Sequence, residues 1–193
     1  MQTMRNRGAP IFALLAFGAW AVTAIGLFLP WVTVTVKICE LIVCLPEIEI
    51  YSSHSTLLQL LVPIDITQFL PNVNHYLTSL IISNFFPTFN QYLAALTRAA
   101  QVLLGSVIVL LLALSFFAVR SRRGHPPHKM SAAIALLTSL VGLAAVYVTM
   151  QTLTEMQRHV NGVHTAFGSG FWTVCTGLVL VGLIMLVQLL TRA

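Results

Sequence analysis

The sequence predicts an all-α membrane protein: a four-transmembrane-helix bundle with a small extracytoplasmic cap of short β-strands and short helices. Four apolar blocks of 19 to 21 residues contain no Asp, Glu, Lys, Arg or His. A helix of about 20 residues spans the hydrocarbon core of a bilayer, which is roughly 30 Å thick. Charged residues make up only 8% of the 193-residue chain, whereas soluble domains carry about 25%. We therefore expect a single membrane domain over residues 1–193.

The first block, residues 11–29, predicts the first transmembrane helix. Pro10 suits a helix start, and Pro30 cannot continue the helix. A cleaved signal peptide is the alternative, because Ala19-Trp20-Ala21 offers a small-x-small cleavage site after a basic start. The apolar run continues to Leu29, which is longer than a usual signal core, and this length favours a retained helix.

Residues 31–93 form the predicted cap, which begins with β-strands. Trp31 is expected at the membrane interface, where indole rings prefer to lie. Apolar and polar residues alternate over residues 32–39 and again over 46–51, and residues 41–44 are also β-prone. A period of two is typical of a strand, so we expect a small antiparallel sheet.

The rest of the cap, residues 52–93, is almost uncharged and is interrupted by Pro63, Pro71 and Pro87. This pattern predicts two or three short helices. Such an apolar loop packs within the protein and on lipid headgroups, covers a partner, or lines a pocket for lipid or another apolar ligand. The candidate surface residues are Leu57, Leu58, Leu61, Ile64, Phe69, Phe85 and Phe86.

Residues 99–119, 131–150 and 171–190 predict the second, third and fourth transmembrane helices. Residues 120–129 between the second and third carry four basic residues, Gly124 and two prolines, which indicates a tight solvated turn. In the outer loop 151–170, residues 151–160 extend the third helix, Asn161-Gly162 makes a turn, and Gly168-Ser169-Gly170 is interpreted as a flexible hinge.

Small residues recur along one face of the third predicted helix, at spacings of three and four. They allow helix backbones to approach closely in lipid, so this helix is expected at the packing centre. The pattern leaves open whether it packs on its own chain or on another subunit. The predicted packing residues are Ser131, Ala135, Ser139, Gly142, Ala145 and Thr149.

The charges are sorted by side. With the N-terminus inside, seven of the ten basic residues fall in the cytoplasm and all five carboxylates fall outside. This is the positive-inside pattern, which predicts that both termini are cytoplasmic in a plasma or inner membrane. The basic residues then have a topological role, and nucleic-acid binding is not expected.

Cys39 and Cys44 are both expected outside the membrane, where disulfides form. A structural disulfide, two free thiols and a redox-active pair are all open interpretations, whereas Cys175 in the fourth helix is interpreted as a packing residue. Four-helix membrane thiol oxidases also carry a cysteine pair after their first helix. Theirs is a C-x-x-C with a second pair in the other loop, and residues 151–170 contain no cysteine, so we set that family aside.

A second resemblance is one of layout. The order Trp31, Cys39, Cys44 after the first helix, the long β-prone first loop and the short basic inner loop are similar to claudin-like and peripheral-myelin-like tetraspan proteins. Gly-Leu-Trp does not precede the first cysteine, so the resemblance covers topology and carries no specific motif. It implies cytoplasmic termini and a cell-surface role.

Function is predicted from what the four helices lack. Apart from Cys175, they hold no ionisable side chain, whereas pumps and ion-coupled transporters need intramembrane charge. The histidines are scattered in loops, and no metal site, cofactor or catalytic motif is expected. We expect a non-catalytic accessory or scaffold subunit of a membrane complex, or a cell-surface tetraspan, that interacts through its apolar outer cap and contacts lipids and other membrane subunits or itself. The alternatives are a thiol-disulfide enzyme using Cys39 and Cys44, and a lipid- or hydrophobic-ligand-binding protein.

Overall fold

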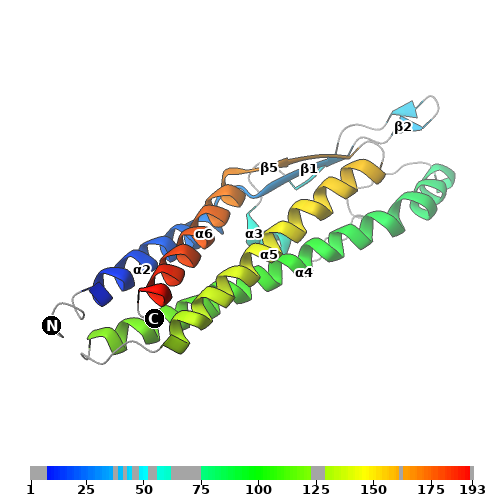
Figure 1. The fold of residues 1–193 in the computed structure, drawn as a ribbon. Coiled ribbons are helices and arrows are strands. Elements are labelled where there is room, and N and C mark those ends of the chain that lie inside the picture. The colour runs from blue at the N-terminus through cyan, green and yellow to red at the C-terminus, as the bar shows by residue number, and fades with distance from the viewer. Residues whose placement is uncertain are drawn as a thin grey trace.

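The computed structural model describes residues 8–36, 39–40, 43–44, 48–51, 56–61, 75–122, 129–160 and 163–191 (Figure 1). Most of these residues are helical. The long helices are α2 (Gly8–Gly26), α4 (His75–Arg122), α5 (Lys129–His159) and α6 (Ser169–Leu190), and α3 (Leu57–Leu60) is a single turn. The strands are β1 (Val32–Val36), β2 (Cys39–Glu40), β3 (Val43–Cys44), β4 (Ile48–Tyr51) and β5 (Val163–Phe167).

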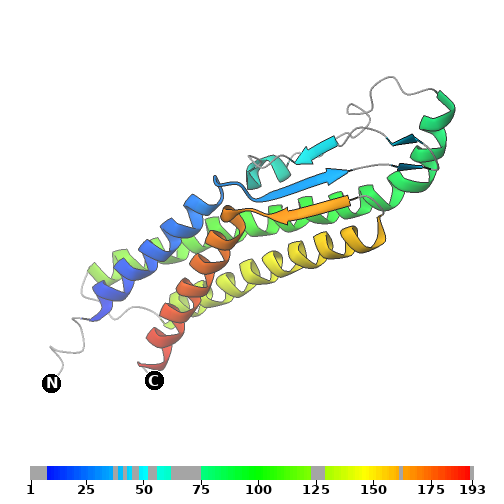
Figure 2. The same cartoon turned by 90° about the horizontal axis from the view of Figure 1, so that it is seen from above.

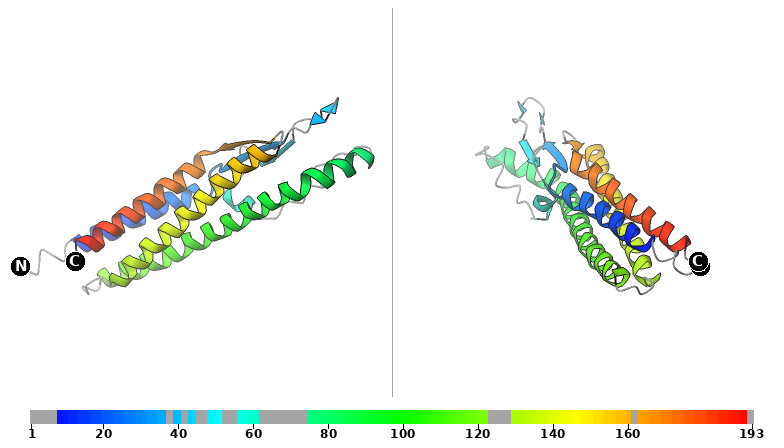
Figure 3. Two further views of the ribbon diagram at one scale, coloured as in Figure 1. Left: turned by 45° about the vertical axis from the view of Figure 1, so that its right-hand side comes forward. Right: turned by 90° about the vertical axis from the view of Figure 1, so that its left-hand side faces the viewer.

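The four long helices lie side by side, with α4 against α5 and α2 against α6, and α5 joins the two pairs by packing on α6 (Figures 1 and 3). Three stretches are long and apolar enough to cross a membrane, namely Thr88–Arg120, Lys129–His159 and Ser169–Leu190. These stretches mark the chain as a membrane protein. The apolar part of α2, Ile11–Gly26, is shorter.

α2 ends at Gly26, three residues before the predicted end at Leu29. The backbone then tightens, because Leu27 donates to the carbonyl of Ala24 at 3.2 Å and Phe28 donates to that of Ile25 at 3.0 Å. These i to i−3 bonds close the last turn in the 3₁₀ manner. Since Pro30 disfavours helical geometry at the preceding residue, the chain turns here into β1.

α4 is one continuous helix of 48 residues that passes through Pro87. The expectation that Pro87 interrupts a series of short helices was therefore wrong. A proline inside a helix removes one backbone hydrogen bond and kinks the axis, and here the helical segments on both sides are long enough to continue. At 1.5 Å per residue α4 is about 72 Å long and α5 about 46 Å, so both exceed the roughly 30 Å of a bilayer core.

The projecting ends of α4 and α5 carry a three-stranded antiparallel sheet in the order β4-β1-β5 (Figure 2). The expected strands in residues 32–39 and 46–51 are present in part, as β1, β2 and β4. β5 was missed, because residues 163–167 were assigned to a loop between a turn and a hinge. It pairs with β1 from Val32↔Phe167 to Val36↔Val163, so the two segments that connect the helices at this end share one sheet.

The start of α2, the end of α6 and the ends of α4 and α5 around their connection lie at one end of the molecule, and the sheet lies at the other (Figures 1 and 3). The buried core runs through both regions. In the helices it consists largely of alanines and leucines, and towards the sheet it gains aromatic side chains such as Trp31, Phe89 and Phe171.

Candidate functional site

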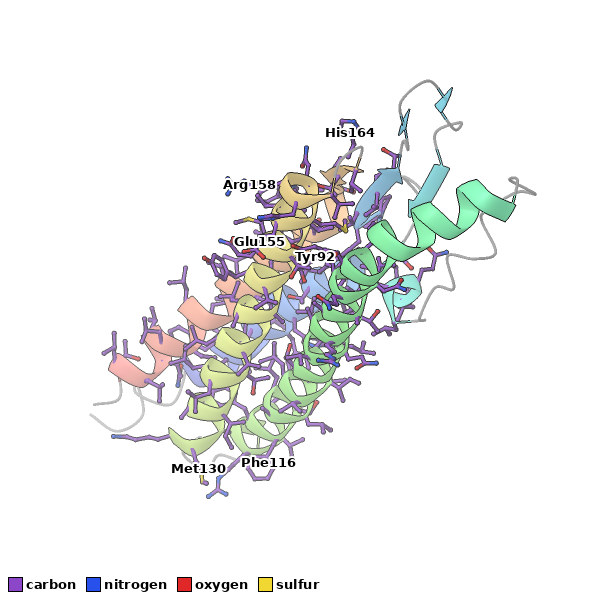
Figure 4. All side chains as sticks on the ribbon, turned by 90° about the vertical axis from the view of Figure 1, so that its right-hand side faces the viewer. Tyr92, Phe116, Met130, Glu155, Arg158 and His164 are labelled. Atoms are coloured by element: carbon purple, nitrogen blue, oxygen red, sulfur yellow. The ribbon has the colours of Figure 1, made fainter. Side chains whose placement is uncertain are left out.

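The sheet presents one polar face to the exterior. In β1, Val32 and Val34 are buried, whereas the alternate residues Thr33 and Thr35 are half-buried. The register pairs Thr33 with Ala166 and Thr35 with His164, and both β5 partners are exposed. Directly paired residues share a face of a sheet. We call Thr33, Thr35, His164 and Ala166 the outer sheet face, and Figure 4 shows His164 at this end of the molecule.

The other face of the sheet covers an apolar core. Val32, Val34 and Val163 of the sheet belong to the same buried cluster as Leu57 and Leu60 of α3, Leu93 and Leu96 of α4, and Leu153 and Met156 of α5. Thr165 reaches from β5 to α5, where its hydroxyl donates to Oε1 of Gln157 at 3.1 Å. The described apolar residues of this region therefore point mainly inward and fix the sheet on the helices.

The residues predicted to form a partner or lipid surface differ in how exposed they are. Leu57 is 0% exposed and lies in the core, Leu58 is 39% exposed, and Leu61 is half-buried. Ile64 and Phe69 lie outside the described residues, and for Phe85 and Phe86 only the helical backbone of α4 is described. In this chain Leu57 therefore belongs to the core, and Leu58 is the accessible leucine of α3.

Two glycines fasten the sheet to the helices. The N–H of Gly168 donates to the carbonyl of Trp31 at 2.8 Å, and that of Gly170 donates to the carbonyl of Pro30 at 2.7 Å. A Cβ on Gly168 would collide with the Pro30 carbonyl oxygen, and one on Gly170 would lie 2.7 Å from the carbonyl oxygens of Gly26 and Leu29. The segment interpreted as a flexible hinge is therefore a close backbone crossing.

Trp31 is fully buried within the chain at this crossing. Its ring meets that of Phe171 edge to face, with centroids 5.4 Å apart. Its indole Nε1 is buried without a hydrogen-bond partner. Trp172 on α6 is 57% exposed, and an exposed indole ring suits a membrane–water interface.

The six predicted packing residues of α5 are all buried. A Cβ on Gly142 would lie 2.9 Å from the Ser106 hydroxyl of α4 and 3.0 Å from Leu178 of α6. The small-residue face is thus covered by helices of the same chain. On the other side of α6, a Cβ on Gly177 would collide with the Thr23 hydroxyl, so α2 also approaches closely.

Hydroxyl groups inside the helix bundle donate hydrogen bonds to backbone carbonyls of their own helix. Thr23, Ser106, Ser139 and Thr149 donate to carbonyls three or four residues earlier, at 2.7 to 3.1 Å. Trp20 is different, because its Nε1 donates across to the carbonyl of Val107 at 3.1 Å and ties α2 to α4. These bonds satisfy buried polar atoms and fix helix packing.

The chemistry-bearing residues are sparse. Among the residues that the structure describes, no three His, Cys, Asp or Glu side chains are grouped so that they could hold a metal ion. Cys175 is a half-buried free thiol. The backbone register pairs Cys39 directly with Cys44 across β2 and β3.

No protein-family model, curated protein or solved structure matches this chain. The functional interpretation therefore rests on the sequence and geometry of the chain itself. Among the strands that the structure describes, sequence reasoning missed β5, whose signal was the β-prone run Val163-His-Thr-Ala-Phe167.

Proposed function

We propose that this chain is a non-catalytic four-span membrane protein that serves as an accessory or scaffold subunit of a larger assembly, or as a cell-surface tetraspan. In this proposal α2 also crosses the membrane, in addition to the three longer helices. Both termini are then cytoplasmic, and the sheet forms an extracytoplasmic cap. The partner contacts the outer sheet face.

The observation that carries this proposal is the hydrogen bonding of the hydroxyl groups buried between the helices. The hydroxyls of Thr23, Ser106, Ser139 and Thr149 bond to their own helices. A path for ions or protons needs ionisable or bridging polar groups along its length. Hydroxyls that are committed to local carbonyls among small residues instead favour a rigid, tightly packed support.

The exposed surface of the helices also favours a role within an assembly. In each of the three membrane-length windows only 33% of the residues are buried within the chain. The rest present side chains such as Leu112, Leu137 and Leu183 to the exterior. This surface suits lipid or a neighbouring subunit, whereas the outer sheet face, with two threonines and a histidine, suits an aqueous contact.

The test is native mass spectrometry of the tagged protein, purified from its own membrane in a mild detergent. We expect a complex with fixed stoichiometry. Ala166→Arg places a long charged side chain on the outer sheet face and should release the partner. Gln91→Arg adds the same charge at an exposed residue of α4, outside the sheet, and should leave the complex intact.

A chain that runs alone, or only with copies of itself, would contradict the accessory-subunit role. Loss of the complex in both variants would contradict the placement of the contact on the outer sheet face. A lone chain that carries one tightly bound lipid would instead support the lipid-binding alternative.

A further inference from the structure

The cysteine pair lies on a two-stranded antiparallel ribbon formed by β2 and β3, which is separate from the three-stranded sheet. In the sequence β2 and β3 fall between β1 and β4, which pair antiparallel as far as Val36↔Ile48. Figure 1 shows the short strands at the label β2 beyond the end of the three-stranded sheet and clear of the helices.

The register places the cysteines at a position that favours a cross-link. The pair nearest the turn is Glu40↔Val43, and only two residues separate its members. A pair that closes so short a loop is hydrogen-bonded, and pairs alternate along an antiparallel ladder. Cys39↔Cys44, the next pair, is therefore a non-hydrogen-bonded pair, in which Cα atoms lie about 4.5 Å apart. Disulfides bridge Cα separations of about 4.4 to 6.8 Å.

We propose that Cys39 and Cys44 form a reversible disulfide that is exchanged by a small-molecule disulfide such as oxidised glutathione. The thiolate of one cysteine attacks the glutathione disulfide, forms a mixed disulfide and releases one glutathione thiol. The thiolate of the second cysteine then displaces the second glutathione. The protein loses two electrons and two protons, and the glutathione disulfide is reduced to two thiols.

The small size of the closed loop indicates that this bond is exchangeable. The bond would close a loop with only four residues between the cysteines, so it constrains the unfolded chain little. Among the described residues, β2 and β3 pair only with each other. The site therefore differs from a permanent staple inside a packed core.

The consequence is a redox-dependent ribbon tip. In the oxidised form the covalent bond holds the register of β2 and β3, and in the reduced form two backbone pairs hold it. Exposure of the site to an oxidising compartment rests on the topology in the proposed function. The exchange reaction itself does not depend on any partner, so the two proposals can fail separately.

The test is a redox titration of the full chain in detergent micelles, with Cys175→Ala to remove the third thiol. The protein is equilibrated with glutathione buffers of varied reduced-to-oxidised ratio, free thiols are blocked with a maleimide, and Cys39 and Cys44 are quantified by peptide mass spectrometry. We expect the disulfide fraction to rise and fall reversibly within the accessible ratios. Amide hydrogen exchange over residues 39–44 should slow at least about tenfold on oxidation.

The matched control moves the pair by one register position. Glu40→Cys and Val43→Cys, combined with Cys39→Ser and Cys44→Ser, place the thiols at the hydrogen-bonded pair, where facing side chains lie farther apart than in a non-hydrogen-bonded pair. Because the two sulfur atoms start farther apart, this control should oxidise at least about tenfold more slowly. Equal oxidation would overturn the register argument. A bond that persists in the most reducing buffer would overturn reversibility, and thiols that never pair would overturn the site.

Discussion

At the scale of single residues, glycines set how closely the helices and the sheet approach. Gly177 lies against Thr23, and Gly168 and Gly170 lie against the backbone of Pro30, Gly26 and Leu29. At Gly168 and Gly170 the obstacle to a Cβ is mainly backbone, which cannot rotate away as a side chain can. The residue types alone do not indicate this close approach, because Gly-Ser-Gly is equally typical of a mobile linker.

Gly177→Ala should destabilise the contact between α2 and α6. The added Cβ would collide with the Thr23 hydroxyl and would lie 2.8 Å from the Thr23 backbone nitrogen. Overpacking of this kind costs about 1–3 kcal/mol, which a thermal unfolding scan in detergent would detect as a lower Tm. Gly105→Ala is the matched control, because a Cβ there meets nothing within 4 Å. Its Tm should stay equal or rise, and an equal fall in both variants would contradict this packing.

At the scale of elements, α3 shows how burial separates adjacent leucines. Leu57 is 0% exposed and Leu58 is 39% exposed. Leu57→Ala should lower the free energy of unfolding by about 2–5 kcal/mol, as for other buried leucines, whereas Leu58→Ala should change it by less than about 0.5 kcal/mol. Denaturant-dependent proteolysis of the two variants compares these costs. Equal sensitivity would mean that α3 does not pack under the sheet.

The same scale shows what the sequence could predict. Helical spacing placed the small face of α5 correctly, because in a helix the period itself determines which residues share a side. The period-two pattern likewise located β1 and β4. Leu57 was assigned to a surface because hydrophobicity does not say whether an apolar residue faces a partner or its own core. β5 was missed because five residues carry too weak a signal, and their pairing partner, β1, is over a hundred residues away.

Pro87 illustrates a different limit. Proline predicts a helix end from local geometry, yet α4 continues through it. The single hydrogen bond that a proline removes is therefore not enough to end the helix here. The length of α4 matters for function, because its projecting end, with that of α5, is the support on which the sheet rests.

At the scale of the whole molecule, the arrangement has two unlike ends. The start of α2, the end of α6 and the adjoining ends of α4 and α5 lie opposite the sheet (Figure 1). Arg120 and Lys129 flank the connection between α4 and α5, and the sheet end includes Glu49 in β4 and His164 in β5. The basic connection and the sheet thus lie at opposite ends of the molecule, which is the arrangement that the proposed four membrane crossings require.

The most direct test of this architecture is side-specific labelling in intact cells. In a background with Cys39→Ser, Cys44→Ser and Cys175→Ala, one variant carries His164→Cys and the other carries Lys129→Cys. A membrane-impermeant maleimide should label the His164→Cys protein in intact cells and the Lys129→Cys protein only after permeabilisation. Labelling of both from the same side, or the reverse pattern, would contradict a cap held outside the membrane by four crossing helices.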